Sequence, residues 1–383
     1  MATDWDAVAL GDAGTWVSGG TPSTSNADYW NGGIPWMSAK SMTEFRVRAS
    51  DRRLTPLGAQ NGTKLVPKDV ILMVVRGMSL KTEFRMGITQ REVALSQDLK
   101  GLIPDPQFDP LFLAYAIQSK TPEVLAMVDE AGHGTGRLQT DRLFALELPK
   151  PTIDEQRAIA TTLGALDDKI ESNRRLIDLA PRVIRAYIDS ELADGVEVPV
   201  SSLASFINGG AYTKGASGAG RMVLRIAELN SGPGGSTVYN DIAVPDDKTA
   251  RPGDILMSWS GSLGVYRWFR DEAIINQHIF KVIPTVYPAW LMFDRLDAVM
   301  PVFRRVAQDK ATTMGHIQRG HLESTKITVP STESIDRLSE SLTPLWERLL
   351  LADRENIRLW ATRDALLPEL LSGRLRAPRE VVA

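Results

Sequence analysis

The chain of 383 residues is long enough for two or three domains with separate cores, and its 43% hydrophobic and 24% charged residues are typical of a globular protein. It contains no cysteine, which excludes disulfides and thiolate metal sites, and its net charge of −3 argues against a protein that simply coats nucleic acid. No stretch resembles a signal peptide or reaches the ~20 apolar residues of a membrane span, so we expect a cytoplasmic protein.

The first 150 residues predict a globular domain, which we call head 1 (residues 1–150). Short β-branched runs such as residues 70–75 (VILMVV) are bounded by glycine and proline, which is typical of strands. A helix is expected over residues 110–119. Head 1 is therefore predicted to hold a mixed sheet with a few helices.

A long helix is predicted next, over residues 151–194. Pro151 and the acidic residues Asp154 and Glu155 are typical of a helix start. Apolar residues then recur at alternating spacings of four and three, which indicates a coiled-coil seam. Its members are Ile159, Leu163, Leu166, Ile170, Asn173 and Ile177. Pro181 is expected to kink or interrupt this helix.

The rest of the chain repeats the first part. The repeated segments are residues 17–20 with 207–210, 67–72 with 252–257, and 136–139 with 315–318. The spacing between copies only shortens along the chain, as expected for a duplication with shortened loops. We therefore predict head 2 (residues 195–330), followed by a second long helix and tail (residues 331–383). The second seam is Leu338, Leu342, Leu345, Leu349, Ala352, Asn356 and Leu359.

The two seams predict how the helices meet. Asn173 and Asn356 interrupt otherwise apolar seams, and a buried amide needs a partner. An antiparallel pair with Asn173 opposite Asn356 satisfies both amides and has the two-fold symmetry of a duplicated chain. The expected fold is thus α+β, with two mixed-sheet domains joined by an antiparallel coiled coil in a pseudo-two-fold arrangement.

Residues typical of a catalytic centre are missing. The four histidines are His133, His278, His316 and His321; the last two are five apart and do not share a helix face, so no metal site is expected. There is no phosphate-binding loop, and residues 261–264 (GSLG) lack the order of a nucleophile elbow. We expect no enzyme activity and no cofactor in this chain.

Several motifs resemble the specificity subunits of type I restriction-modification systems. Residues 19–23 (GGTPS), 28–30 (DYW) and 33–36 (GIPW) resemble the opening of that family's target-recognition domains, and residues 366–375 (LLPELLSGRL) resemble its C-terminal end. The resemblance covers the whole chain, in the order of domain and helix. The second copy departs from it, because Ala211, Tyr212 and Thr213 follow its Gly-Gly pair and Ser334 and Ile335 replace Glu155 and Gln156.

The resemblance implies a subunit that recognises DNA and assembles with enzymes. Each head would read one half of a bipartite double-stranded DNA site from the major groove. The helices, about 57 Å long for 38 residues, would set the distance between half-sites. Two methyltransferase subunits, which bind S-adenosylmethionine, and restriction-translocase subunits, which need ATP and Mg²⁺, would be the partners.

Polar residues in glycine-rich loops beside strands are the candidates for DNA contact. Arginine suits guanine and glutamine suits adenine in bidentate pairing. The candidates are Lys40, Arg76, Lys81, Arg137 and Gln139 in head 1, and Trp259, Gln277, His278, His316, Gln318 and Arg319 in head 2. Trp30 and Trp36 are expected to be core anchors. A further set is left open between phosphate contact and a solvated face: Arg46, Arg48, Arg52 and Arg53.

Two other functions compete with DNA recognition. A coiled-coil scaffold for other proteins would explain the helices and would have no DNA affinity. A stand-alone DNA-modifying enzyme would need a centre of an unfamiliar kind, against which the missing motifs weigh.

Overall fold

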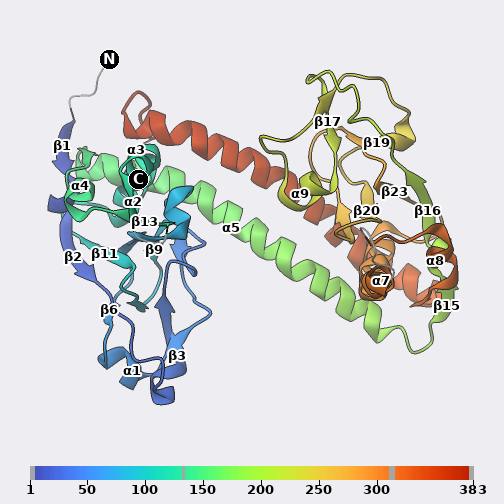
Figure 1. The fold of residues 1–383 in the computed structure, drawn as a ribbon, viewed down its shortest axis with the longest axis horizontal. Coiled ribbons are helices and arrows are strands. Elements are labelled where there is room, and N and C mark those ends of the chain that lie inside the picture. Colours follow the sequence, from blue (N-terminus) through green and yellow to red (C-terminus); the bar gives the residue numbers. More distant parts are fainter. Residues whose placement is uncertain (1–4, 132–133, 310–314, 379–383) are drawn as a thin grey trace. The chain divides into compact units, whose positions relative to one another are not determined.

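A computed structural model describes residues 5–131, 134–309 and 315–378. The chain divides into two compact units, each described by itself: unit 1 consists of residues 1–168 and 359–383, and unit 2 of residues 169–358. Each unit contains one head and a part of each of two long helices, α5 (Ile153–Ser190) and α9 (Thr332–Leu371) (Figure 1).

Head 1 contains two larger sheets and two smaller ones. The first sheet has the order β2 (Gly14–Ser18), β11 (Leu99–Pro104), β7 (Ile71–Val74), β9 (Met86–Thr89) and β4 (Arg46–Val47). The second has the order β5 (Arg53–Leu54), β3 (Trp30–Met37), β10 (Val93–Leu95) and β6 (Lys64–Val66). In addition, β1 (Asp6–Ala9) pairs with β14 (Glu147–Lys150), and β13 (Thr135–Leu138) lies between β12 (Val128–Ala131) and β8 (Arg76–Gly77).

The core of unit 1 joins head 1 to both long helices. The short helices of head 1 are α1 (Pro56–Gln60), α2 (Pro110–Ser119), α3 (Thr121–Ala126) and α4 (Thr140–Phe144), and α2 matches the helix predicted there. Buried side chains of α2 and of β7 belong to one cluster. The long helices add Ile159, Leu163, Leu370 and Leu371 to it.

Head 2 repeats the order of four strands in each of the two larger sheets of head 1. Its first sheet has the order β16 (Ala204–Asn208), β23 (Ile279–Pro284), β20 (Ile255–Ser258) and β21 (Gly264–Arg267). Its second has the order β18 (Tyr239–Asn240), β17 (Arg221–Leu224), β22 (Ala273–Ile275) and β19 (Thr249–Ala250), and β15 (Val196–Pro199) pairs with β24 (Lys326–Val329). Its helices are α6 (Ile226–Ser231), α7 (Ala289–Asp309) and α8 (Arg319–Ser324).

The duplication predicted from the sequence is therefore present in the strand order of the two heads. Even the direction of pairing repeats: β10 runs parallel to β3 in head 1, and β22 runs parallel to β17 in head 2. The fold is α+β, with two mixed-sheet domains and a pair of long helices.

The parts of α5 and α9 that lie in the same unit are antiparallel. In unit 2, Asn173 contacts Asn356, while Glu191 just after α5 accepts a hydrogen bond from Ser334 at the start of α9. In unit 1, Arg363 of α9 donates to Asp167 of α5 at 3.0 Å. Every residue of the two predicted seams is buried or half-buried.

One expectation about α5 is wrong in part, because Pro181 does not interrupt the helix. The helix continues from Ile153 to Ser190 with this proline inside it. A proline leaves one backbone carbonyl of the preceding turn without its N–H partner. Ala180, Ile184 and Ile188 on both sides of it are buried against α9 residues in one apolar cluster, and this packing keeps the segment helical.

The paired asparagines form the most buried polar contact of the helix seam in unit 2. Asn173 and Asn356 have exposed fractions of 2% and 3%. The Asn173 Nδ2 donates to Asn356 Oδ1 at 3.1 Å and to Glu355 Oε2 at 2.8 Å. This is the pair that the predicted register sets opposite each other.

In unit 1, a buried tyrosine ties head 1 to the helices. The Tyr115 hydroxyl on α2 donates to Asp167 Oδ2 at 2.6 Å, and Asp167 Oδ1 accepts from Arg363. Burial, and then the charge of Asp167, raise the pKa of the Tyr115 phenol above its ordinary value. The neutral phenol is therefore the form that the folded unit requires.

Substitution of the asparagines tests the seam. Asn173→Leu leaves the Asn356 amide buried without its partner and should lower the free energy of unfolding by about 1–3 kcal/mol. Asn173→Leu combined with Asn356→Leu removes both amides and should regain at least that stability. Urea unfolding followed by circular dichroism measures both. A double variant less stable than either single variant would contradict this assignment.

Alkaline pH tests the tyrosine. An unfolded tyrosine releases its proton near pH 10, whereas the folded Tyr115 keeps it, so the stability that this group contributes below pH 10 is lost as pH rises further. Tyr115→Phe should be less stable at pH 8, because it loses a hydrogen bond, but its urea midpoint should fall less between pH 8 and pH 11. Tyr187→Phe, at a half-exposed position of α5, is the control and should follow the wild type.

Candidate nucleic-acid interface

Most candidate residues lie on or beside a set of backbone hydrogen bonds that recurs in the two heads. In head 1, the Val75 N–H donates to the Asp98 carbonyl, and the Leu138 N–H donates to the Val75 carbonyl, both at 2.9 Å. In head 2, Trp259 bonds in the same way to His278 at 3.2 Å and Ile317 bonds to Trp259 at 3.0 Å. The two heads therefore share these two backbone hydrogen bonds, which we call the backbone frame, but carry different side chains on it.

In head 1 this frame brings two arginines together. Arg137 of β13 is paired with Arg76 of β8 in the strand register, and both side chains are exposed. Lys81 pairs with Glu130 at 2.9 Å, and the Gln139 side chain donates to Asp129 at 2.6 Å. Four of the five candidates of head 1 thus lie on or beside strands β8, β12 and β13.

The fifth, Lys40, is not part of this group. It lies in the loop after β3, where it pairs with Asp51 at 3.5 Å. Both side chains are exposed, so this pair contributes little to stability.

In head 2 the frame carries aromatic rings and histidines. The Trp259 ring centre lies 5.5 Å from that of His278 and 6.4 Å from that of His316. Ser260 Oγ lies 3.0 Å from His278 Nδ1, and Gln277 Nε2 lies 3.2 Å from His278 Nε2. The Trp259 Nε1 is buried and has no hydrogen-bond partner among the residues that the structure describes. Four head 2 candidates therefore form one cluster.

The remaining two candidates lie at the start of α8. The Gln318 N–H donates to Nδ1 of His321, which belongs to the same turn. The Arg319 guanidinium donates to the Phe206 carbonyl at 3.4 Å. Both side chains are exposed. They lie two and three residues after His316 and extend the head 2 cluster.

The tryptophans and arginines of residues 30–53 lie in different surroundings: some are packed in the domain, one contacts α5 and two are exposed. Trp36 is buried, and Trp30 packs edge-on against it with ring centres 5.4 Å apart, which agrees with core anchors. Arg52 lies over the Trp30 ring at 3.7 Å. Arg46 donates to the Gly164 carbonyl of α5 and pairs with Asp168, so it fastens head 1 to the helix. The side chains of Arg48 and Arg53 are exposed.

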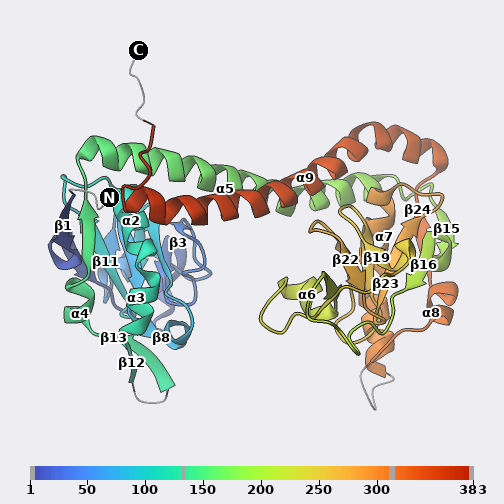
Figure 2. The ribbon, with the colours of Figure 1, turned by 90° about the horizontal axis from the view of Figure 1, so that it is seen from above.

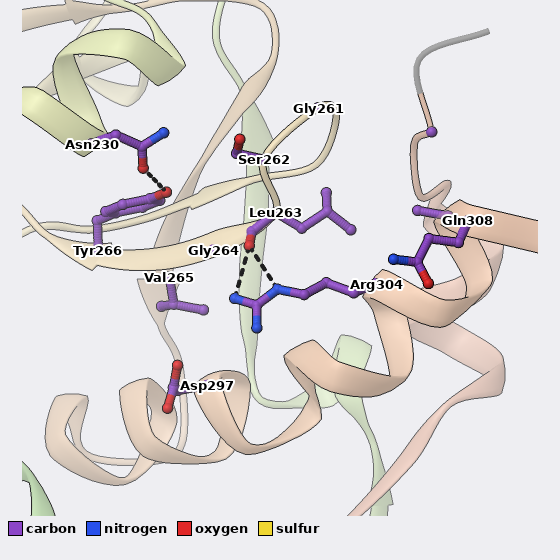
Figure 3. A pocket seen from close by; sticks show the side chains of 12 residues that line it. Asn230, Gly261, Ser262, Leu263, Gly264, Val265, Tyr266, Asp297, Arg304 and Gln308 are labelled. Carbon is purple, nitrogen blue, oxygen red and sulfur yellow. Dashed lines mark hydrogen bonds between the residues drawn. The ribbon is translucent and has the colours of Figure 1, made fainter. Parts of the chain in front are cut away.

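A hollow of about 670 Å³ adjoins the head 2 cluster (Figure 3). It lies between the β20–β21 turn and α7, where Arg304 donates twice to the Leu263 carbonyl, at 3.2 and 3.0 Å. On the opposite side, the Tyr266 hydroxyl donates to Asn230 at 2.7 Å. No sequence pattern predicts this hollow, because its lining comes from α6, the β20–β21 turn, β21 and α7, which lie apart in the chain.

The strand connection beside this hollow differs in length between the two heads. Only residues 259–263 connect β20 to β21, whereas residues 75–85 connect β7 to β9 in head 1. The longer loop contains a 3₁₀ turn whose Leu80 is buried in the core of unit 1.

The part of the chain that the structure describes shows neither a metal site nor a membrane-spanning helix. No group of three or more histidine, aspartate or glutamate side chains is placed there to hold a metal ion. His133 lies outside the described residues. None of the helices described is both long enough and apolar enough to cross a membrane.

Comparison with known proteins finds a matching family model and similar sequences. Residues 2–181 match the model of the type I restriction modification DNA specificity domain. The specificity subunit of the type I restriction enzyme EcoR124I/EcoR124II of Escherichia coli is 31% identical over 160 residues, which are 41% of this chain and 40% of that protein. The specificity subunit of the MjaIX enzyme of Methanocaldococcus jannaschii is 24% identical over an alignment that covers 97% of this chain and 94% of that protein.

A solved structure has the same fold. The crystal structure of the S subunit of a type I restriction-modification system from M. genitalium aligns with a TM-score of 0.65 at 15% identity and covers 96% of each chain. A fold with two heads and two long helices is thus shared over 96% of each chain.

Proposed function

We propose that this chain is a specificity subunit of a type I restriction-modification system and that it reads a bipartite DNA target for a complex whose other subunits carry out the chemistry. Each head recognises one half-site, and the chain itself contributes no catalytic group. The complex acts on DNA in the cytoplasm.

One observation carries this proposal: two heads with the same strand order present unlike polar side chains on the same backbone frame. Arg76 and Arg137 in head 1 correspond to Ser260 and His316 in head 2, since both pairs face each other across neighbouring strands. Side chains of different hydrogen-bonding chemistry select different base edges in the major groove. Two unlike half-sites follow from this difference.

The partners we propose are two methyltransferase subunits, which bind S-adenosylmethionine, and restriction-translocase subunits, which use ATP and Mg²⁺. Support comes from an apolar stripe on α5, formed by Leu179, Val183 and Tyr187. Their exposed fractions are 54%, 44% and 53%, and a spacing of four residues puts them on one face of the helix. We assign this stripe to the docking of a methyltransferase subunit.

DNA methylation in cells tests the recognition function. Cells that make this chain together with its methyltransferase should carry a methylated motif of two unequal halves with a fixed gap. Replacing residues 1–150 by the head of another specificity subunit should change one half only. A scaffold without DNA binding predicts no motif that depends on this chain, and a stand-alone enzyme predicts methyl transfer by the isolated chain. Either result, or a change in both halves, contradicts the proposal.

The docking stripe is tested separately. Leu179→Ser combined with Val183→Ser should weaken co-purification of the methyltransferase by at least tenfold, because the buried apolar area is lost. The matched control is Arg182→Ala on the same helix segment, whose side chain is 71% exposed. Equal loss in both variants, or no loss in either, would show that the stripe is not the docking surface. Circular dichroism checks that the helices remain folded.

A further inference from the structure

Strands β12, β13 and β8 form a narrow ribbon at the end of unit 1 opposite α5 and α9 (Figure 2). β12 and β13 are antiparallel, and their register places Asp129 beside Arg137. Arg137 in turn lies beside Arg76 of β8. One acidic and two basic side chains therefore form a row across three strands.

The underside of this ribbon is packed and its outer face is open. Gly136 and Leu138 are buried, whereas Arg137 between them is exposed, as the alternation of a strand requires. A Cβ at Gly136 would meet Leu80 Cβ at 2.9 Å and Val128 Cγ1 at 3.1 Å, so the ribbon lies tightly on the core. Arg76 and Arg137 thus stand on a rigid base.

The charges on the outer face are unbalanced. Among the described residues, neither the Arg76 nor the Arg137 side chain has a hydrogen-bond or ion-pair partner. The acid of the row is already engaged, since Asp129 accepts from Gln139 with one oxygen and from Arg142 with the other, at 2.6 and 3.2 Å. Like charges on directly opposed strand residues are destabilising. A bound group with hydrogen-bond acceptor atoms would reduce the repulsion between these two arginines.

We propose that this ribbon enters the major groove and that Arg76 and Arg137 each read a guanine, in adjacent base pairs of the half-site of head 1. The inference rests on the proposed function. The major groove admits a two-stranded ribbon, and the arginine fork matches guanine O6 and N7. Opposed strand residues lie about 5 Å apart, which is close enough to the 3.4 Å base-pair rise for flexible side chains to reach neighbouring pairs.

Head 2 has no such pair. At the corresponding place Ser260 faces His316, next to the Trp259 ring, and β20 is followed by the short turn at residues 259–263. The requirement for two adjacent G·C pairs therefore applies to the half-site of head 1 and not to that of head 2.

Lysine substitutions separate base reading from simple attraction to phosphate. Arg76→Lys and Arg137→Lys keep the positive charge but lose the two-pronged contact. The experiment uses the full chain with its methyltransferase, after head exchange has assigned the two half-sites. Each variant should lose about 5- to 150-fold discrimination at one G·C pair of the head 1 half-site and none in the other half. Arg91→Lys, an exposed arginine in the turn between β9 and β10, is the control and should keep the wild-type motif.

A second measurement needs no DNA. Arg137→Gln removes the like-charge contact and should raise the thermal midpoint of the full chain at low salt, whereas Arg91→Gln should not. If Arg137 serves DNA binding at the expense of stability, Arg137→Gln should both raise the thermal midpoint and lose the selection for guanine.

Three results would overturn the proposal. If both lysine variants keep the wild-type motif, the pair does not read guanine. If alanine variants weaken binding equally on all sequences while the lysine variants bind normally, the pair contacts phosphate, and the proposed function stands without this inference. If the wild-type chain directs no motif at all, the proposed function fails, and this inference fails with it.

Discussion

Polar side chains buried between the heads and the long helices are the constraint on which the rest of each unit depends. In unit 2, Arg267 of β21 pairs with Asp353 of α9 at 2.6 Å, with side-chain exposed fractions of 9% and 15%. Burial lowers the pKa of the Arg267 guanidinium and raises the pKa of the Asp353 carboxyl, because removing either charged group from water costs free energy. A buried ion pair of this kind adds little net stability, but a misplaced head would leave either charge alone at a much larger cost. The contact thus fixes how head and helix meet.

In unit 1, different polar residues attach the head to the long helices. Tyr115 and Arg46 bind the consecutive acids Asp167 and Asp168 of α5, and Arg363 of α9 shares Asp167. In both units these attachments join the head to α5 or α9 and do not use the candidate residues for DNA contact. Loops can therefore vary in length and chemistry, as the β7–β9 and β20–β21 connections do, while the frame stays the same.

Features that depend on local periodicity were predictable from the sequence. The repeat, the two long helices and the Asn173–Asn356 register follow from residue spacing alone, because heptads fix which face of a helix is buried. Contacts that depend on tertiary register were not predictable. Arg76 and Arg137 were candidates singly, but 60 residues of chain separate them, and only strand pairing makes them neighbours. The hollow beside Arg304 and the uninterrupted helix at Pro181 were missed for the same reason: packing between distant segments decides both.

The composition of unit 1 has a consequence for the order of events during synthesis. Its core includes Leu370 and Leu371, which are made only after all of unit 2. At ribosomal speeds of about 5–20 residues per second, head 1 waits about 10–40 s for the helix that completes its core. Unit 2 is continuous in the chain and can close first. A nascent chain therefore passes through a state in which the second head is folded and the first still exposes apolar surface. During this interval the chain is most exposed to aggregation and most dependent on chaperones.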